Sequence, residues 1–542
     1  MAPECDKAGL FRGVAHILHA GTCQNCEQGR REALYPPEYT HVERHDDIRI
    51  VIFDAAQNIV GMGRMDFTQH QPAPGMLEHV PEEIWATCLW ACKTALRKAG
   101  ITAADLAGIG ITNQRETTIV WDRKTGKAIH NAVVWRDIRA AETCQRLRDR
   151  LPEADKLVRR RTGLMLAPYF SAPKVKWILD HVKGARQRAR RGELAFGTVD
   201  SWLIWRLTGG RVHATDATNA SRTLFYDLKS GDWHEDLIEL FDVPASMLPR
   251  VLDSADDFGL TEPSVLGAAV PIHGVVGDQQ AALIGQGCFA PGMAKSTYGT
   301  SCFALLNTGS ICVKSRHRLL TTVAYRLGGK TTYALEGVIF TIGGALQWLR
   351  DDLEIIRDWP EADALAAVSD PDEDVYLVPA FSGLGAPWWD NEARGTLVGL
   401  TRNSRRAELV RAALEAVGYQ SRDMFEAMRR DLKLEQAMVL RVDGGMVASD
   451  WTMQFLADIL DLPVDCTRVP EVTALGAAWL TAWKTGLWPE ADSFGARRDF
   501  HQEFLPRMAP ALRKRKLRGW RGALDKALTG AVAFEKARRP FG

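Results

Sequence analysis

Asn113–Thr117 (NQRET) is a short polar segment that directly follows the apolar run GIGIT. Its adjacent Arg115 and Glu116 offer hydrogen-bond donors and acceptors side by side, which suits the neighbouring hydroxyls of a small polyol. The alternative interpretation is a surface ion pair, which contributes little energy. The segment is therefore a candidate binding site for a small polyol.

Asp278 is a candidate general base for a reaction at a hydroxyl of that polyol. It follows the apolar run VPIHGVVG and precedes the helix-like AALIGQG, so we expect it where a strand ends and a helix begins. Catalytic groups of α/β proteins gather at such strand ends, although an Asp there can also simply cap the helix. Three aromatic residues could wall the carbon face of a polyol or could simply be core residues: Trp135, Tyr169 and Phe303.

Three glycine-rich turns in the second half of the chain indicate a nucleotide site. Tyr298–Ser301 reads as a hairpin turn that can direct N–H groups and hydroxyls at phosphate. Thr341–Ala345 opens a helix, and helix starts attract anions. Asp443–Gly445 lies between a strand and a helix, where a flat ring could rest on the glycine backbone. Each of these is an ordinary turn on its own, but together they favour a nucleotide cleft.

The elements that position these residues alternate between strand and helix from Ile48 to about residue 488. A β-hairpin is predicted around Gln57-Asn58, and an amphipathic helix over Pro81–Ala99. Strands are predicted at LAGIGIT and TTIVWD, followed by a helix from about Asp137. The alternation favours an α/β architecture with covered sheets.

Two segments depart from this alternation. Leu384–Asp390 (LGAPWWD) is a Gly-, Pro- and Trp-rich loop that is too apolar for a plain solvent loop. The stretch from Arg507 is basic, and we expect it to be a solvated, partly helical tail.

The composition limits the classes of function. The 542 residues carry 68 Lys and Arg against 67 Asp and Glu, a net charge of +1, so no electrostatic footprint for nucleic acid or an acidic membrane is expected. No apolar run reaches membrane-spanning length. The ten cysteines are scattered, which suits a reducing cytoplasm. Cys23 and Cys26, with His41 and His45 nearby, could hold a metal, but the spacing favours an incidental pair.

From about Ile48 to about Trp488 the chain resembles the glycerol kinases of the FGGY family of carbohydrate kinases. Lys174–Trp177 and the stretch GTLVGLTRNSRRAELVRAALEAV resemble the two signature segments of that family. Further blocks resemble it in the same order: GITNQRETTIVWDRKTGKAIHNAVVWRD, PYFSAPKVKWILDH, TDATNASRTLF, GDQQAALIGQGCF, STYGTSCF, GGALQWLRD and LRVDGGMVASDWTMQFLADIL.

The resemblance implies an α/β fold of two actin-like ATPase (ribonuclease H-like) domains with a nucleotide and substrate cleft between them. It implies a glycerol-binding domain over 48–285 and an ATP-binding domain over 286–490, with an atypical segment 1–47 before them and a basic tail 491–542 after them. The implied reaction is the ATP-dependent phosphorylation of glycerol to sn-glycerol 3-phosphate, in the cytoplasm.

For the acceptor site, the resemblance implies a role for each matching residue. Asp278 accepts the proton of the attacking terminal hydroxyl. Trp135 and Phe303 pack against the carbons of glycerol. The residues implied to hydrogen-bond its hydroxyls are Arg115, Glu116, Tyr169, Asp278 and Gln279.

For the nucleotide site, Gly299 and Thr300 are implied to hold phosphates, with Gly343 and Gln347 nearby, and Arg49 resembles a nucleotide contact. Gly445 backs the adenine. Ser449 stands where the family often has Asn, and its hydroxyl can still hydrogen-bond the base. The implied cofactors are ATP and Mg²⁺. The Mg²⁺ arrives with ATP and keeps most of its waters, so no protein ligand is assigned to it.

The N-terminus departs from the family pattern, which begins with an apolar strand that ends in Asp-Gln-Gly-Thr-Thr. Ile48–Asp54 resembles the second strand of that pattern, and counting back without a gap places the motif on Val42–Asp46 (VERHD). That stretch lacks the Gly, the Thr and the leading Asp. The preceding YPPEYTH carries two prolines, which cannot donate to a central ladder. The sequence therefore predicts that half of the phosphate clamp and a core strand are absent, and that the kinase is poor or inactive.

Three interpretations remain open. The chain is a glycerol kinase whose N-terminal sequence is altered by a frameshift or a wrong start, a polyol-binding pseudokinase, or a kinase of a related polyol or sugar. A decayed enzyme is expected to scatter changes through both halves of its site, whereas everything after Ile48 reads intact, which favours the first.

The resemblance also bears on partners and control. Glycerol and ATP are the expected partners, without nucleic acid or membrane insertion, and a homodimer or homotetramer is expected by analogy. Some bacterial relatives carry Gly-Gly-x-Arg for fructose 1,6-bisphosphate before the catalytic Asp. Here that loop is Leu266–Pro271 (LGAAVP), which has no Arg, so this control is expected to be absent.

Overall fold

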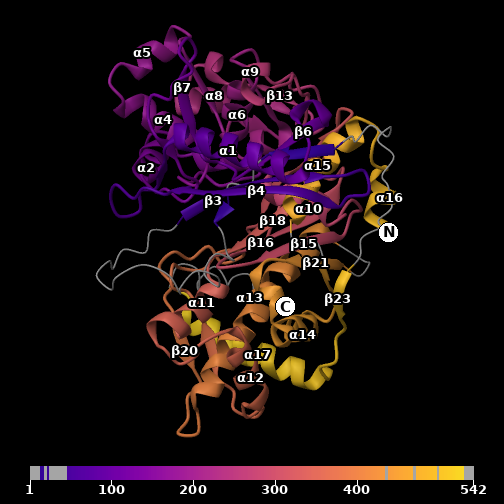
Figure 1. Cartoon of the computed structure of the whole chain (residues 1–542). Helices are drawn as coiled ribbons and strands as arrows, with labels where there is room; N and C mark the ends of the chain where they lie inside the picture. The colour runs from indigo at the N-terminus through magenta and orange to yellow at the C-terminus, as the bar shows by residue number, and fades with distance from the viewer. Residues whose placement is uncertain are drawn as a thin grey trace, which may run out of the picture. The chain divides into compact units, whose positions relative to one another are not determined.

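The computed structural model describes residues 13–17, 21–22, 45–433, 438–467, 471–496 and 500–529. These residues form two compact units (Figure 1). The first unit comprises the described residues up to Gly287, together with Thr322–Tyr333 and the described part of Glu471–Arg497. The second comprises Cys288–Thr321 and the described parts of Ala334–Pro470 and Arg498–Gly542.

The first unit is built on a six-stranded sheet with the order β14-β6-β1-β3-β2, in which β4 also pairs with β3. Its strands are β1 (Gly13–Ile17), β2 (Gly21–Thr22), β3 (His45–Phe53), β4 (Ile59–Thr68), β5 (Glu78–His79), β6 (Leu106–Asn113), β7 (Ile119–Asp122), β8 (Ala132–Val133), β9 (Leu194–Gly197), β10 (Ala214–Asp216), β11 (Tyr226–Asp227), β12 (Asp232–Trp233), β13 (Arg250–Leu252) and β14 (Ile272–Gly277).

Helices cover this sheet. Helix α15 (Val472–Lys484) lies very close to β6. A Cβ atom at Gly110 of β6 would lie only 2.4 Å from the carbonyl oxygen of Ala477 in α15, so this close approach requires glycine. The helices of this unit are α1 (Pro81–Ala99), α2 (Ala141–Arg150), α3 (Ala154–Thr162), α4 (Ser171–His181), α5 (Ala185–Arg190), α6 (Val199–Leu207), α7 (Ala217–Ala220), α8 (Glu235–Phe241), α9 (Pro263–Leu266), α10 (Asp278–Gly285), α15 (Val472–Lys484) and α16 (Ala491–Ala496).

Most predicted elements of this unit are confirmed. The hairpin β3–β4 turns where predicted, with Gln57 in the left-handed region at φ 70°. Helix α1 has the predicted bounds, Pro81–Ala99. Helix α2 begins at Ala141 rather than near Asp137, because the Asp137 carboxylate accepts hydrogen bonds from the Leu77 amide and from Arg139.

A strand precedes β3 in the sheet, contrary to the expectation from the sequence. The strand β1 lies between β3 and β6, antiparallel to the first and parallel to the second. The gapless count was wrong because β1 ends at Ile17, far upstream, and because β3 begins at His45. His45 and Asp46, expected in a turn, therefore lie in a strand. Residues 42–44 of the expected motif, and Cys23, Cys26 and His41, lie outside the described residues.

The second unit is built on a seven-stranded sheet with the order β17-β18-β16-β15-β21-β22-β23. Its strands are β15 (Met293–Tyr298), β16 (Cys302–Gly309), β17 (Leu320–Leu327), β18 (Lys330–Ile339), β19 (Tyr376–Val378), β20 (Thr396–Val398), β21 (Val439–Asp443), β22 (Val464–Thr467) and β23 (Phe500–Phe504). Its helices are α11 (Gly343–Gln347), continued by a π-helical turn over Trp348–Asp352, then α12 (Trp359–Val368), α13 (Arg406–Leu432), α14 (Asp450–Leu460) and α17 (Pro510–Ala527). The residues Thr322–Tyr333, which include most of β17, the turn after it and the start of β18, belong to the first unit.

The C-terminal stretch is not the solvated tail that its charge suggested. The strand β23 extends the sheet beside β22, and α17 packs against the unit (Figure 1). Trp520 is 1% exposed and stacks on Tyr419. The basic composition of this stretch led to the wrong prediction, because one of its lysines, Lys516, is buried and paired with Glu415 at 2.7 Å. Leu384–Asp390 behaves as predicted, since Trp388 is buried in the same core.

Among the described residues no helix is both long and apolar enough to cross a membrane, and no group of three or more His, Cys, Asp or Glu side chains could hold a metal ion.

Candidate acceptor and nucleotide sites

Arg115 and Glu116 follow β6 and are both buried, which excludes the surface ion pair. The Arg115 Nε lies 3.2 Å from Oδ1 of Asp278, and its Nη1 donates to Gln280 at 3.3 Å. Gly277 makes this approach possible, since a Cβ there would lie 2.8 Å from the Arg115 side chain. The ends of β6 and β14 thus bring Arg115 and Asp278 together.

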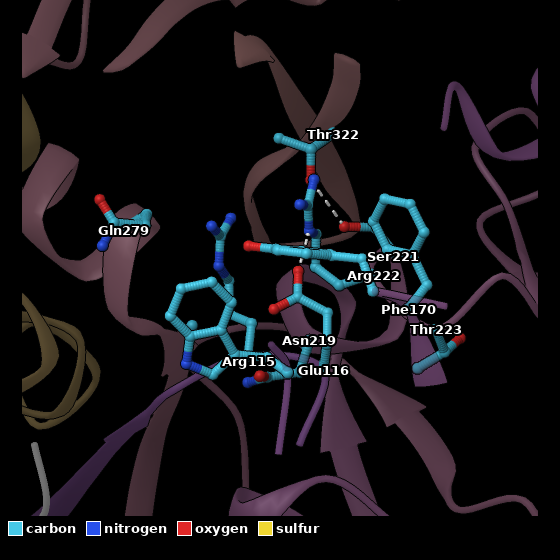
Figure 2. A network of polar contacts seen from close by, with 12 residues as sticks. Arg115, Glu116, Phe170, Asn219, Ser221, Arg222, Thr223, Gln279 and Thr322 are labelled. Carbon is cyan, nitrogen blue, oxygen red and sulfur yellow. Dashed lines mark hydrogen bonds and ion pairs between the residues drawn. The ribbon is translucent and has the colours of Figure 1, made fainter. Parts of the chain in front are cut away.

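Glu116 is held on the other side by Arg222, whose Nε donates to Oε1 at 2.6 Å (Figure 2). Its backbone lies in the left-handed region at φ 63°, an uncommon conformation for a residue with a side chain. The Glu116 carbonyl accepts hydrogen bonds from Thr118 Oγ1 and Ser171 Oγ, both at 3.0 Å. These contacts fix an otherwise costly conformation, which is typical of functional sites.

Trp135 and Tyr169 are brought together beside this cluster. Their ring centroids are 5.4 Å apart at 68°. The fully buried Lys174 of α4 donates from Nζ to the backbone carbonyls of Tyr169 and Phe170, the latter at 3.3 Å. Burial lowers the pKa of Lys174 to about 7, although Glu116 and Asp137 favour its charge. The lysine therefore braces the backbone of the aromatic wall.

Asp278 and Gln279 begin α10, as predicted, and both are half-buried. The cap residue of the helix is Gly277, and Asp278 occupies the first helical position. Its Oδ1 accepts from the Gln279 amide at 2.6 Å. Asp278 therefore combines a local structural role with a position next to Arg115.

The three glycine-rich turns converge in the second unit. The amide of Gly343 donates to the carbonyl of Gly299 at 2.9 Å, and the Ile342 amide donates to Thr300 at 2.9 Å. Gly444, at φ 98°, lies against Tyr298, whose carbonyl would meet a Cβ there at 2.3 Å. The hairpin turn, the start of α11 and the turn after β21 thus form one backbone cluster, as a nucleotide site requires.

The remaining predicted nucleotide residues have varied surroundings. Arg49 of β3, in the first unit, pairs with Asp47 at 2.8 Å and Glu471 at 3.0 Å. Gln347 ends α11 and is half-buried, and Gly445 is exposed at the start of a 3₁₀ turn.

Ser449 caps α14, and its hydroxyl donates to Asp363 at 2.6 Å. That hydroxyl is thus engaged within the protein. Phe303, the third predicted wall residue, lies on β16 of the second unit, where its carbonyl accepts from Lys295 Nζ at 3.3 Å.

Comparison with known proteins identifies the family. The N-terminal domain of the FGGY family of carbohydrate kinases matches residues 46–285, and its C-terminal domain matches residues 294–485. The chain belongs to the FGGY family of carbohydrate kinases. Its fold is accordingly the two-domain α/β fold of that family, as the sequence predicted.

Several relatives of this FGGY kinase are named for one activity. A protein named Glycerol kinase from Rhizobium rhizogenes is 57% identical over 483 residues, covering 89% of this chain and 97% of the relative. One of the same name from Allorhizobium ampelinum is 59% identical over 482 residues, with the same coverage.

Among solved structures, Plasmodium falciparum glycerol kinase with ADP is similar with a TM-score of 0.83 and 35% identity, covering 89% of this chain and 96% of that one. A gluconate kinase from Lactobacillus acidophilus shares the fold at 20% identity and a TM-score of 0.80.

The sequence analysis did not predict a role for two buried cationic residues of this FGGY kinase, Arg222 and Lys174. Arg222 lies in the block TDATNASRTLF, and Lys174 in a signature segment, but neither was given a role. A signal was present for Arg222: it is the one charged residue in the run ATNASRTLF. A lone charge among small and apolar residues indicates a buried ion pair, because a buried charge requires a partner.

Proposed function

We propose that this chain is an ATP-dependent glycerol kinase, which transfers the γ-phosphoryl group of MgATP to a terminal hydroxyl of glycerol and yields sn-glycerol 3-phosphate and ADP. The observation that carries the proposal is the polar cluster of the buried Arg115 and Glu116 with the half-buried Asp278, in a chain 57–59% identical to proteins named Glycerol kinase.

In the proposed acceptor site, Glu116 and Arg115 bind the hydroxyls of glycerol, with Tyr169 and Gln279 as further partners. Trp135, with Phe303 of the second unit, packs against the carbons. Asp278 accepts the proton of the terminal hydroxyl as its oxygen attacks the γ-phosphorus. The ion pair with Arg115 directs the Asp278 carboxylate toward the same hydroxyls.

In the proposed nucleotide site, the turn at Gly299-Thr300 and the start of α11 at Gly343 hold the phosphates. The N–H group and the hydroxyl of Thr300 neutralise charge on the transferred group as its bond to the β-phosphate oxygen breaks. Mg²⁺ enters with ATP as part of the substrate. Gly445 supports the adenine, and Gln347, Arg49 and Ser449 are further candidates for nucleotide contact.

The relatives bear on the choice of substrate. The relatives at 55–59% identity carry the name Glycerol kinase, whereas the gluconate and xylulose kinases resemble the chain at 20–24% identity and show the fold alone. We therefore propose glycerol over another polyol or sugar. As for most enzymes with free, reduced cysteines, we propose a cytoplasmic location, and a homodimer or homotetramer by analogy with the family.

A second candidate is a polyol-binding protein that does not transfer phosphate. The observation that favours it is that no Asp-Gln-Gly-Thr-Thr motif stands in the sequence before Ile48.

Two assays separate the candidates. Calorimetry with glycerol, xylitol and xylulose tests the acceptor site without turnover, and ATP-dependent formation of glycerol 3-phosphate tests transfer. Glycerol binding with turnover, in the chain as it stands or after replacement of residues 1–47, supports the kinase. Glycerol binding without turnover in both forms supports the second candidate. Binding of the pentitol or pentulose in place of glycerol would make the substrate assignment wrong.

A further inference from the structure

Arg222 is a fully buried cation in the first unit, and the proposed reaction does not use it directly. Its side chain is 0% exposed, and its Nε lies 2.6 Å from Oε1 of Glu116, which is 2% exposed. Figure 2 shows the Glu116 carboxylate directed at this guanidinium. Two charges removed from water at this distance interact strongly, but each is costly to bury alone.

The backbone around Arg222 is anchored on several sides. Ser221 Oγ lies 3.0 Å from Oγ1 of Thr322 (Figure 2). The Thr223 carbonyl accepts a hydrogen bond from the Ala172 amide at 2.8 Å. The preceding helix α7 is capped by Asp216, which accepts from the amides of Thr218 and Asn219. Arg222 therefore projects from a rigid support rather than from an adaptable loop.

The guanidinium also lies over the ring of Phe170, with Cζ 5.2 Å from the ring centroid. Phe170 follows Tyr169 of the aromatic wall, and their rings are 5.2 Å apart. Glu116 thus balances the charge of the guanidinium, and the ring of Phe170 fixes its direction.

We propose that Arg222 is a positioning residue, which keeps the buried Glu116 carboxylate charged and oriented so that it accepts a hydrogen bond from a hydroxyl of the acceptor polyol. This inference rests on the proposed function. A carboxylate has several lone-pair sites, so pairing with Arg222 leaves it able to accept from substrate. Without Arg222, a carboxylate buried to this degree would protonate or turn toward another donor, and the acceptor hydroxyl would lose its partner.

An arginine suits this role better than a lysine. A planar guanidinium can stack on Phe170 and donate from Nε at the same time, whereas an ammonium is a point charge that cannot do both. Arg222→Lys keeps the charge and most of the volume, so it tests orientation with little risk to folding.

The test is a double-mutant cycle on glycerol binding, measured by calorimetry on the full chain, which needs no turnover. The four proteins are wild type, Arg222→Lys, Glu116→Gln and the double variant. Each single substitution is expected to weaken glycerol binding about tenfold. If Arg222 acts through Glu116, the double variant should bind no more than about twofold more weakly than the weaker single variant.

A merely structural role for Arg222 would give losses that multiply to about a hundredfold in the double variant. The matched control is Arg326→Lys, which alters an ion pair of the same length in the same unit, 2.6 Å from Arg326 Nε to Asp253, outside the proposed site. Combined with Glu116→Gln, it should show no coupling.

The failures are distinguishable. If wild type binds glycerol and the Arg222 losses multiply, the inference is overturned alone. If wild type binds no glycerol, the proposed function is overturned and the inference falls with it. Melting temperatures of all variants check that folding is retained, and an Arg222→Lys protein that unfolds at the assay temperature would assign Arg222 to the core and overturn the inference.

Discussion

Arg115 and Glu116 are adjacent in sequence, yet each pairs with a residue far along the chain, Asp278 and Arg222 respectively. This separation gives the proposed acceptor site two independently supported polar groups. Because both are buried, their charges are held by these partners rather than by water. The result is a small set of fixed donors and acceptors, which is what recognition of a polyol hydroxyl pattern needs.

Asp278→Asn tests the proposed general base. The amide keeps the shape of the side chain but cannot accept the hydroxyl proton, so kcat should fall by about 10²–10⁴ while glycerol affinity changes little. The measurement combines glycerol 3-phosphate formation, in whichever form of the enzyme turns over, with calorimetry of glycerol. Asp149→Asn, on the exposed face of α2, is the control. Unchanged turnover in Asp278→Asn would exclude Asp278 as the base.

The residues of the candidate site could be predicted from the sequence better than their partners. The types and order of Arg115, Glu116 and Asp278 indicated an acceptor site. The sequence could not show that Arg222 lies against Glu116, since that contact depends on how the segment after β10 folds back to β6. Ser449 is a similar case, because its engagement with Asp363 depends on where α12 packs.

The elements differ in how far their own residues specify them. The hairpin β3–β4 and helix α1 carry local signals, a turn at Gln57 and a proline at the first helical position, and both form as predicted. The strand β1 has no such signal, because its five residues gain their place from pairing with β3 and β6. Likewise, the charged residues of α17 predict a solvated helix, but the helix packs against the core of the second unit. The sequence alone does not show that packing.

The packing of α17 leads to a prediction about stability. Trp520 is buried, stacks on Tyr419 at 5.1 Å and donates to Asp423 at 2.9 Å. Trp520→Ala should destabilise the second unit by about 3–5 kcal/mol, as expected for loss of a large core side chain. Chemical denaturation measures the change. Trp90→Ala, at a position 47% exposed on α1, should change stability by no more than about 0.5 kcal/mol. Equal effects of the two would place α17 outside the core.

Lys174 on α4 predicts a pH dependence of stability. Burial lowers its pKa from 10.5 to about 7, against the attraction of Glu116, Asp137 and Cys144 and with a smaller opposing charge on Arg139. Between pH 7 and 10.5 the unfolded chain therefore holds a proton that the folded chain lacks. Stability should rise with pH across that window, by up to about 1.4 kcal/mol per pH unit, with no such gain below pH 7.

The measurement compares urea unfolding of wild type and Lys174→Met from pH 6 to 9.5. The stability of wild type relative to the variant should increase above pH 7, because methionine has no proton to release. Lys176→Met, on the same helix and paired with Asp180 at 3.2 Å, controls for loss of a lysine from α4. A difference that stays constant with pH would mean that Lys174 stays charged throughout.

At the scale of the whole molecule, most of the proposed acceptor residues and the proposed phosphate-binding turns belong to different units. The acceptor residues Arg115, Glu116 and Asp278 lie in the first, and the glycine turns around Gly299 and Gly343 lie in the second. Glycerol binding without ATP therefore tests the acceptor residues, and nucleotide binding tests the glycine turns.

Control by fructose 1,6-bisphosphate is predicted to be absent. The loop Leu266–Pro271 has no arginine, so a bisphosphate lacks the bidentate partner that phosphate recognition favours. Thermal unfolding of the full chain should not shift with millimolar fructose 1,6-bisphosphate, whereas glycerol should raise the melting temperature as a bound ligand does. A shift with the sugar bisphosphate would reveal a site elsewhere on the chain.

The last prediction concerns phosphoryl transfer by the chain as it stands. Transfer needs the γ-phosphate held from both sides, so that charge on its oxygens is neutralised. In the proposed site the turn at Gly299-Thr300 holds one side, and no Asp-Gln-Gly-Thr-Thr motif stands before Ile48 to hold the other. Losing one oxyanion donor costs about a hundredfold in rate, and here a whole turn differs. We therefore expect a poor or inactive kinase, with the defect confined to residues before Ile48.

Replacing residues 1–47 with a short apolar strand ending in Asp-Gln-Gly-Thr-Thr-Ser, joined just before Ile48, should restore ATP-dependent formation of glycerol 3-phosphate by at least about a hundredfold. Because β1 already fills the sheet between β3 and β6, the gain should come from the phosphate turn rather than from a new core strand. A matched graft ending in Ala-Gln-Gly-Ala-Ala-Ser supplies the strand without the turn chemistry and should remain slow. Turnover by the unmodified chain at ordinary kinase rates, about 1–100 s⁻¹, would mean that another segment completes the clamp.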